Sequence, residues 1–357
     1  MKKIAIILGT RPEIIKLSPL IEEFDRRKKS FSLIHTGQHY TQSMDKIFFD
    51  QLGLPSPDFN LKVGSGSHAE ATAAMLVGIE KILAEIMPQT VIVEGDTNTV
   101  LAACLAAAKL NIPVSHVEAG LRSFDRKMPE EINRVVTDHL STFLFAPTKM
   151  ARENLVNEGI SRKRIFVTGN TIVDVVRIHL KLLKQSFGPM AELLSKPFIL
   201  LTLHRQENVD NPLRFRGVLK GVKLLSQESG VKVIYPMHPR SKKMCREYRI
   251  TLPSEIHEID PIDYFSFLSL ESKARLILTD SGGVQEEACI LQVPCVTLRD
   301  TTERPETLIL GANVLSGARP EKILSAGRKQ LDNRKHWSNP FGDGHAAKHI
   351  VDILAED

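Results

Sequence analysis

The chain has 357 residues, of which 42% are hydrophobic and 25% are charged. This balance is typical of a folded globular protein of about two domains, and it excludes a disordered chain, a collagen-like repeat and a small disulfide scaffold. The formal net charge is only +5, from 47 basic and 42 acidic residues. This small excess does not indicate a nucleic-acid partner, but it fits a local anionic ligand such as a nucleotide phosphate.

The first apolar run, residues 4–8, is too short for the apolar part of a signal peptide and predicts a buried first strand. No stretch approaches the roughly 18 apolar residues of a membrane span, so no membrane partner is expected. The four cysteines form no C-x-x-C pair and lie mostly in apolar runs. We therefore expect reduced, buried thiols in a cytoplasmic protein.

Short apolar runs alternate along the chain with amphipathic helical patterns, the first of them over residues 14–24. The runs show little alternation, which is typical of parallel strands covered on both faces, and the order predicts doubly wound α/β layers. The expected strands are residues 3–8, 31–35, 90–94, 113–118, 143–146 and 165–168, then 198–203, 231–235, 275–278 and 294–298.

A break between two such halves is expected at residues 177–196, where a helical pattern gives way to a flexible stretch before a fresh strand. Two α/β halves place a ligand in the cleft between them, at the carboxyl ends of the strands. The loops that follow the predicted strands are therefore the places to look for chemistry.

The loop after the first strand is Gly-Thr-Arg-Pro-Glu, with Pro12 in the first turn of the next helix. Free amides at that helix start, with Arg11 and Lys16 nearby, can hold an anion. An ordinary turn with solvated charges fits the same residues.

Carboxylates follow several strands of the first half. Asp96 is either a helix N-cap or a catalytic base. Glu118 ends the next strand, and Glu130 and Glu131 open a helix, where the helix dipole favours acids whatever the function. Carboxylates that share a cleft raise each other's pKa, so one can serve as an acid while another serves as a base.

In the second half, His204 and Arg205 follow a strand; His204 is either a titrating group or a structural histidine. The sharpest segment is Ser-Gly-Gly at 281–283, between a strand and a helix. Two glycines let the backbone approach a diphosphate, and the helix amides bind it, although a plain glycine-rich turn is the alternative. Glu287, deeper in the helix, can bind a ribose diol.

Two other signals are discounted. The G-x-G-x-x-A pattern at 64–69 lies in the wrong unit for a nicotinamide site. His35 and His39 lack the glutamate of a zinc-protease motif and lie at a strand end. We therefore expect no cofactor and no metal.

Taken together, these loops resemble the motifs of the non-hydrolysing UDP-N-acetylglucosamine 2-epimerases, and they do so in the same order over nearly the whole chain. The matching segments are residues 9–13, 95–97, 116–122, 129–134, 169–171, 280–288, 299–306 and 339–344.

The resemblance implies a two-domain fold like that of the B-type glycosyltransferases, with domains at 1–175 and 176–343 and a last helix, about 344–357, that packs back on the first. It also implies a homodimer, a UDP-sugar substrate and no NAD. The implied reaction eliminates UDP across C1–C2, giving a 2-acetamidoglucal, and then adds UDP back with the C2 proton on the other face.

By motif, the residues that resemble the family's catalytic groups are Asp96, Glu118, Glu130 and His204. Those that resemble its substrate-binding groups are Arg11, Lys16, Arg205, Ser281, Gly282, Gly283, Glu287 and Arg304. Gln38, His39 and Gln42 resemble a regulatory loop that binds a second UDP-sugar, but the arginine that accompanies it in the family is replaced here by Ser67 or His68.

Three alternatives stay open. The segment 123–128 is one residue shorter than in bacterial members, and its form also occurs in 2-epimerases of UDP-2,3-diacetamido-glucuronic acid. A glycosyltransferase of the same fold is the second alternative, although transfer needs at most one of the clustered acids. A non-catalytic nucleotide-sugar-binding protein is the third.

Overall fold

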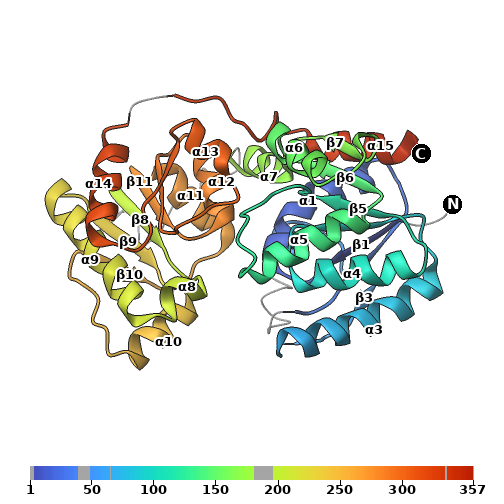
Figure 1. Cartoon of the computed structure of the whole chain (residues 1–357), viewed down its shortest axis with the longest axis horizontal. Coiled ribbons are helices and arrows are strands. Elements are labelled where there is room, and N and C mark those ends of the chain that lie inside the picture. Colours follow the sequence, from blue (N-terminus) through green and yellow to red (C-terminus); the bar gives the residue numbers. More distant parts are fainter. Residues whose placement is uncertain (1–3, 39–48, 65, 181–195, 334–335, 357) are drawn as a thin grey trace. The chain divides into compact units, whose positions relative to one another are not determined.

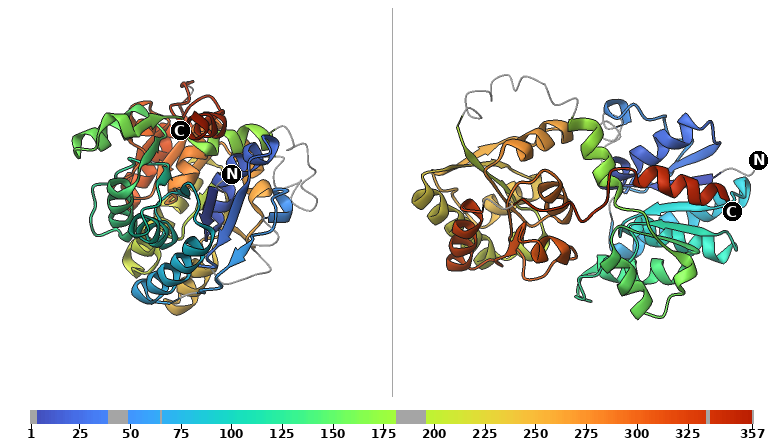
Figure 2. Two further views of the ribbon diagram at one scale, coloured as in Figure 1. Left: turned by 90° about the vertical axis from the view of Figure 1, so that its right-hand side faces the viewer. Right: turned by 90° about the horizontal axis from the view of Figure 1, so that it is seen from above.

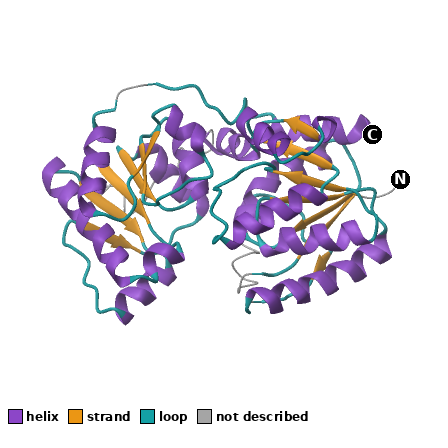
Figure 3. Cartoon of the chain, viewed as in Figure 1, coloured by secondary structure: helices purple, strands orange, loops and turns teal. Residues whose placement is uncertain are grey.

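The computed structural model describes residues 4–38, 49–64, 66–180, 196–333 and 336–356. The chain forms two compact units, of which unit 1 comprises Met1–Val175 and Phe341–Asp357, and unit 2 comprises Val176–Pro340. Each unit is a parallel β-sheet between layers of helices (Figures 1 and 3). This is the doubly wound α/β class that the alternating pattern predicts.

Within the described residues, unit 1 has seven strands in the order β3-β2-β1-β4-β5-β6-β7. All neighbouring pairs are parallel, and the central strands are buried on both faces, as their continuous apolar runs require. The strands are β1 (Ile4–Leu8), β2 (Phe31–His35), β3 (Phe59–Asn60), β4 (Val91–Glu94), β5 (Val114–Val117), β6 (Phe143–Ala146) and β7 (Ile165–Val167).

The helices of unit 1 begin at residues that favour a helix start: Pro12 lies in the first turn of α1, and Thr97 caps α4. The helices are α1 (Arg11–Arg26), α3 (His68–Ile86), α4 (Asn98–Lys109), α5 (Pro129–Leu140), α6 (Lys149–Asn157), α7 (Thr171–Leu180), which continues into unit 2, and α15 (Ala346–Glu356); a 3-10 turn spans Arg162–Arg164.

Helix α15 follows unit 2 in the chain but belongs to unit 1, where it packs beside α1 (Figure 2). Its first amides, those of Ala346 and Ala347, each donate to the Asp174 carboxylate at 3.1 Å. Near its other end Asp352 pairs with Arg27 at 2.6 Å. The last helix is thus tied to unit 1 at two points.

Within the described residues, unit 2 has six strands in the order β10-β9-β8-β11-β12-β13, again parallel. They are β8 (Phe198–Thr202), β9 (Lys232–Pro236), β10 (Ile256–Ile259), β11 (Leu276–Thr279), β12 (Cys295–Thr297) and β13 (Asn313–Leu315). The helices are α8 (Gln206–Val209), α9 (Pro212–Ser229), α10 (Pro239–Glu247), α11 (Tyr264–Lys273), α12 (Gly282–Ile290), α13 (Pro305–Ile309) and α14 (Pro320–Leu331).

Successive residues of β8 enter different cores. Ile199 and Leu201 pack with apolar residues of α9 and α14, whereas Phe198 and Leu200 pack with those of α11 and α12. The sheet is therefore covered on both faces, and its loops at the strand ends are the part of the unit available for chemistry.

All ten expected strands are present, with ends that differ by at most one residue, but β3, β10 and β13 have no counterpart among the expected ones. The helical pattern expected beyond residue 177 continues to Leu180, and the rest of that segment lies outside the described residues. All four cysteines are buried free thiols, as expected. Among the described helices, none combines the length and the apolar character needed to span a membrane.

Candidate active site

In each sheet the strand order reverses at one point, between β1 and β4 in unit 1 and between β8 and β11 in unit 2. Open parallel sheets bind ligands at the carboxyl ends of the strands beside such a switch point. Lys16, Asp96 and Glu118 all come from segments that follow β1, β4 and β5, which are neighbours in the unit 1 sheet.

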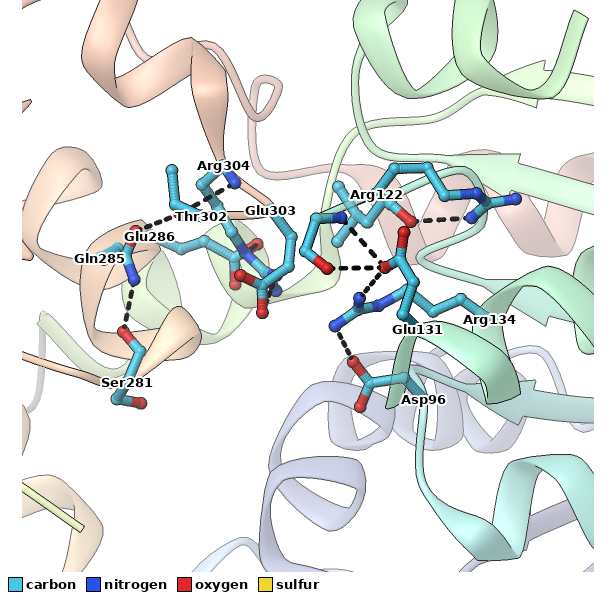
Figure 4. Close-up of polar contacts among 12 residues, drawn as sticks. Asp96, Arg122, Glu131, Arg134, Ser281, Gln285, Glu286, Thr302, Glu303 and Arg304 are labelled. Atoms are coloured by element: carbon cyan, nitrogen blue, oxygen red, sulfur yellow. Dashed lines mark hydrogen bonds and ion pairs between the residues drawn. The ribbon is translucent and has the colours of Figure 1, made fainter. Parts of the chain in front are cut away.

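Asp96 is held by an arginine of helix α5. Nη2 of Arg134 lies 2.5 Å from the Asp96 carboxylate, and Nη1 of the same guanidinium lies 2.5 Å from Glu131 (Figure 4). The Asp96 side chain stays 29% exposed, so it can meet a ligand. Thr97 is the N-cap of α4, which makes the N-cap alternative for Asp96 wrong.

The loop around Asp96 is fixed at further points. Asn133 donates to the Asp96 carbonyl at 2.9 Å. Nε2 of the fully buried His116 lies 2.8 Å from the Gly95 carbonyl, and its Nδ1 lies 2.7 Å from Asp138. Burial raises the pKa of Asp138, but His116 and Arg122 outweigh that effect and hold the pKa below its ordinary value. These ties preorganise the loop that carries Asp96.

Lys16 lies among buried acids. Its ammonium contacts the Glu118 carboxylate directly and lies 3.3 Å from Glu94, and all three side chains are at most 10% exposed. Glu118 has a φ of 70°, a left-handed conformation that costs a non-glycine residue about 1–2 kcal/mol. Strain of this kind is typical of a residue held for function.

Glu13 joins the two loops that flank this cluster. Its carboxylate accepts from the backbone N–H of Gly9 at 2.6 Å and of Thr10 at 2.8 Å, and also from the hydroxyl of Thr97. Burial raises the pKa of Glu13 to about 7, although these hydrogen bonds oppose the rise. Glu13 thus links the loop after β1 to the residue that follows Asp96.

The two acids that open α5 are placed differently. Glu130 is half-buried in the first turn, whereas Glu131 is buried and accepts from the N–H groups of Ser123 at 3.0 Å and Phe124 at 2.8 Å. Glu131 therefore anchors the linker between β5 and α5. Arg11, at the start of α1, is exposed.

In unit 2, Asp280 organises the loop after β8. Its fully buried carboxylate accepts from the N–H groups of His204 at 3.1 Å and Arg205 at 3.0 Å, and from Asn208 at 3.2 Å. Nδ1 of His204 lies 3.2 Å from the same carboxylate, and the imidazole is 37% exposed. His204 is thus both oriented and accessible.

Helix α12 begins at Gly282, with Ser281 at its N-cap position but with no side-chain cap hydrogen bond. A Cβ on Gly282 would lie 3.3 Å from Nη1 of Arg304, so glycine lets that guanidinium approach the helix start. Nε of Arg304 also donates to Glu286 at 3.0 Å (Figure 4). The amides of a helix start with an adjacent guanidinium suit an anionic ligand.

Glu287 is buried on α12 and accepts from the Tyr264 hydroxyl at 2.8 Å. A carboxylate can accept several hydrogen bonds, so a glutamate fixed in this way can also accept one from a sugar hydroxyl. Of the three regulatory candidates, Gln38 accepts from the N–H and hydroxyl of Thr99 at 3.1 and 2.7 Å. His39 and Gln42 lie outside the described residues.

Sequence reasoning missed the groups that hold the candidates in place. One signal for them was present in α5, whose buried residues are polar while Ile132 is 52% exposed. A helix that buries polar residues and exposes an apolar one indicates a polar network rather than an apolar core. The missed residues are Glu13, Glu94, His116, Arg134, Asp138, Tyr264 and Asp280. In the part of the chain that the structure describes, no cluster of side chains has the make-up of a metal site.

Comparison with known proteins identifies the family. The model of the UDP-N-acetylglucosamine 2-epimerase family matches residues 22–355. The UDP-N-acetylglucosamine 2-epimerase of Methanocaldococcus jannaschii is 52% identical over 99% of this chain and 98% of its own length. A crystal structure of the M. jannaschii enzyme in complex with UDP-GlcNAc and UDP has a TM-score of 0.94 at 52% identity, covering 99% and 100% of the two chains.

A further relative is the UDP-2,3-diacetamido-2,3-dideoxy-D-glucuronate 2-epimerase of Pseudomonas aeruginosa, which is 40% identical over 99% of both chains. The similar solved structures share the two-domain B-type glycosyltransferase architecture expected from the sequence. On its near full-length match, the chain belongs to the UDP-N-acetylglucosamine 2-epimerase family.

Proposed function

We propose that this chain interconverts UDP-N-acetylglucosamine and UDP-N-acetylmannosamine. The observation that carries the proposal is that Lys16, Asp96 and Glu118 lie in the segments that follow three neighbouring strands of unit 1, with Lys16 in contact with Glu118. The relatives named UDP-N-acetylglucosamine 2-epimerase, at 52% and 53% identity, support the choice of substrate.

The chemistry explains why several acids are needed. The C2 proton of the sugar is not acidic, so the reaction proceeds by elimination. A carboxylate takes the C2 proton while the C1–O bond breaks and its electron pair leaves with UDP, forming a C1=C2 double bond. Re-addition reverses both changes, with a carboxylic acid returning a proton to the opposite face of C2 as the UDP oxygen re-forms the bond to C1. We assign these proton transfers to Asp96, Glu118 and Glu130.

We assign the uridine diphosphate to unit 2. Ser281, Gly282 and Gly283 present the helix-start amides of α12 to the phosphates, with Arg304 beside them, and Glu287 binds the ribose. The exposed imidazole of His204 and the neighbouring Arg205 stabilise the charge that develops on the leaving diphosphate. No NAD is needed, because no ketone is formed.

The second candidate substrate is UDP-2,3-diacetamido-glucuronic acid. The 40% identity to the P. aeruginosa enzyme favours it. We rank it second because the identity to the UDP-N-acetylglucosamine enzymes is higher.

NMR of the protein with UDP-N-acetylglucosamine in deuterated water tests the proposal. Deuterium at C2 together with UDP-N-acetylmannosamine is the expected result. No exchange at C2, with transfer only after an acceptor is added, would point to a glycosyltransferase, and turnover of the diacetamido-uronate alone would favour the second candidate.

The matched variants are Asp96→Asn and, as control, Asp25→Asn on the exposed side of α1. Asp96→Asn should lower kcat by about 100-fold or more, the usual scale for general acid–base groups, while Asp25→Asn leaves it unchanged. Near-normal turnover by Asp96→Asn would exclude Asp96 as a catalytic acid.

Light scattering of the purified protein tests the homodimer that we also propose.

A further inference from the structure

Glu94 is a buried acid beside the proposed catalytic residues, and the proposed reaction assigns it no role. It is the last residue of β4, two positions before Asp96, and only 2% exposed. Its carboxyl group lies 3.3 Å from the Lys16 ammonium and in hydrogen-bond contact with Glu118. Any role of Glu94 therefore acts through those two neighbours.

The contact between Glu94 and Glu118 requires a proton. Ionised carboxylates only accept hydrogen bonds, so two carboxyl groups in contact need one O–H between them. Burial agrees, because two ionised carboxylates in contact are disfavoured where both acids and the Lys16 ammonium are at most 10% exposed. A third acid, the buried Glu13, lies near enough to disfavour a second negative charge further.

The proton belongs on Glu94. Lys16 contacts Glu118 directly, which favours the ionised form of Glu118, whereas its 3.3 Å separation from Glu94 is a weaker attraction. Burial and the neighbouring Glu118 raise the pKa of Glu94 well above its ordinary value, against the opposing effect of Lys16.

We propose that Glu94 is a positioning residue that stays protonated and donates its O–H to Glu118. Glu118 is thereby held, ionised and oriented, between the ammonium of Lys16 and the carboxylic acid of Glu94. This inference rests on the proposed function, in which Glu118 transfers a proton at C2.

Two variants distinguish a role for the neutral carboxylic acid of Glu94 from a role for its negative charge. Glu94→Gln keeps the size of the side chain and a donor for Glu118, so its kcat, KM and pH profile should stay close to those of the wild type. Glu94→Ala removes the donor, and its kcat should fall by about 100-fold with little change in KM, the scale expected when a reacting group loses its orientation. A Glu94→Gln enzyme as inactive as Glu94→Ala would overturn the proposal, because the charge would then be what matters.

Infrared spectroscopy at neutral pH detects a protonated Glu94 directly and needs no substrate. The wild type should show the carbonyl band of a buried carboxylic acid that Glu94→Gln lacks; identical bands in the two proteins would overturn the proposal even if Glu94→Ala does not fold. A wild-type protein without epimerase activity would instead contradict the proposed function, while the band would still decide where the proton lies.

Discussion

The guanidinium of Arg134 lies 2.5 Å from the carboxylate of Asp96 and 2.5 Å from that of Glu131. One buried cation therefore connects the loop after β4 to Glu131 in the first turn of α5, the residue that anchors the preceding linker. Because the Arg134 side chain is only 3% exposed, its position is set by the fold rather than by solvent. Asp96 is consequently presented to a ligand in one orientation.

Replacing Arg134 with Gln should lower kcat by about 100-fold, because Asp96 loses the group that orients it. The KM for UDP-N-acetylglucosamine should change little, since Arg134 is not among the proposed diphosphate ligands. Steady-state kinetics checks this, with Arg26→Gln as the control; Arg26 also pairs with a glutamate but is 66% exposed. A rise in KM at unchanged kcat would assign Arg134 to substrate binding instead.

The stability of unit 1 should depend on the ionisation of Glu13. Its pKa is raised to about 7 in the folded protein, so the folded state favours the protonated form. The stability from this group is complete below the ordinary pKa and is lost as the pH rises through the folded value. Relative to Glu13→Gln, the wild type should lose about 3 kcal/mol of unfolding free energy between about pH 5 and pH 8. Urea unfolding measures the difference, and parallel pH curves for the two proteins would contradict it.

Gly120 should tolerate no side chain. Its φ of +85° is left-handed, and an added Cβ would overlap the carbonyl oxygen of Ala151. Gly159 has the same conformation, with φ of +86°, but nothing within 4 Å of an added Cβ. Gly159→Ala should therefore cost only about 1 kcal/mol, and Gly120→Ala about 3 kcal/mol or more. Thermal unfolding of the two variants compares them, and equal losses would show that the overlap has no effect.

Tyr264→Phe should weaken UDP binding, because Glu287 loses the hydroxyl that fixes its carboxylate at 2.8 Å. A hydrogen bond to a charged group contributes about 1.5 kcal/mol, which corresponds to about tenfold in Kd. Calorimetric titration with UDP gives the value. Tyr248→Phe is the control, since its hydroxyl donates to an exposed part of unit 2. An unchanged Kd for UDP in Tyr264→Phe would contradict the assignment of Glu287 to the UDP-binding site.

The sequence identified the interior strands better than the edges. Residues 31–35 and 143–146 were located to the residue, whereas β3, β10 and β13 were missed. All three lie at the ends of their sheets. An edge strand is short or half-exposed, as the Ile-His-Glu-Ile of β10 shows, so it lacks the continuous apolar run that marks a strand buried on both faces.

The same limit applies to the site. Asp96, Glu118 and the Ser-Gly-Gly segment are candidates because they follow strands, and that position can be read from the chain. Arg134 and Glu94 matter through the partners that they reach, at separations of 38 and 78 residues. Such pairings depend on how the strands are ordered in the sheet, which local patterns do not specify.

The return of α15 to unit 1 affects how the protein is made. A ribosome must synthesise all of unit 2 before it releases the helix that covers α1 and supplies the partner of Arg27. During that interval unit 1 lacks both the packing of α15 against α1 and the Asp352 partner of Arg27. The first unit therefore stays incomplete during synthesis, and incomplete packing favours aggregation and chaperone binding.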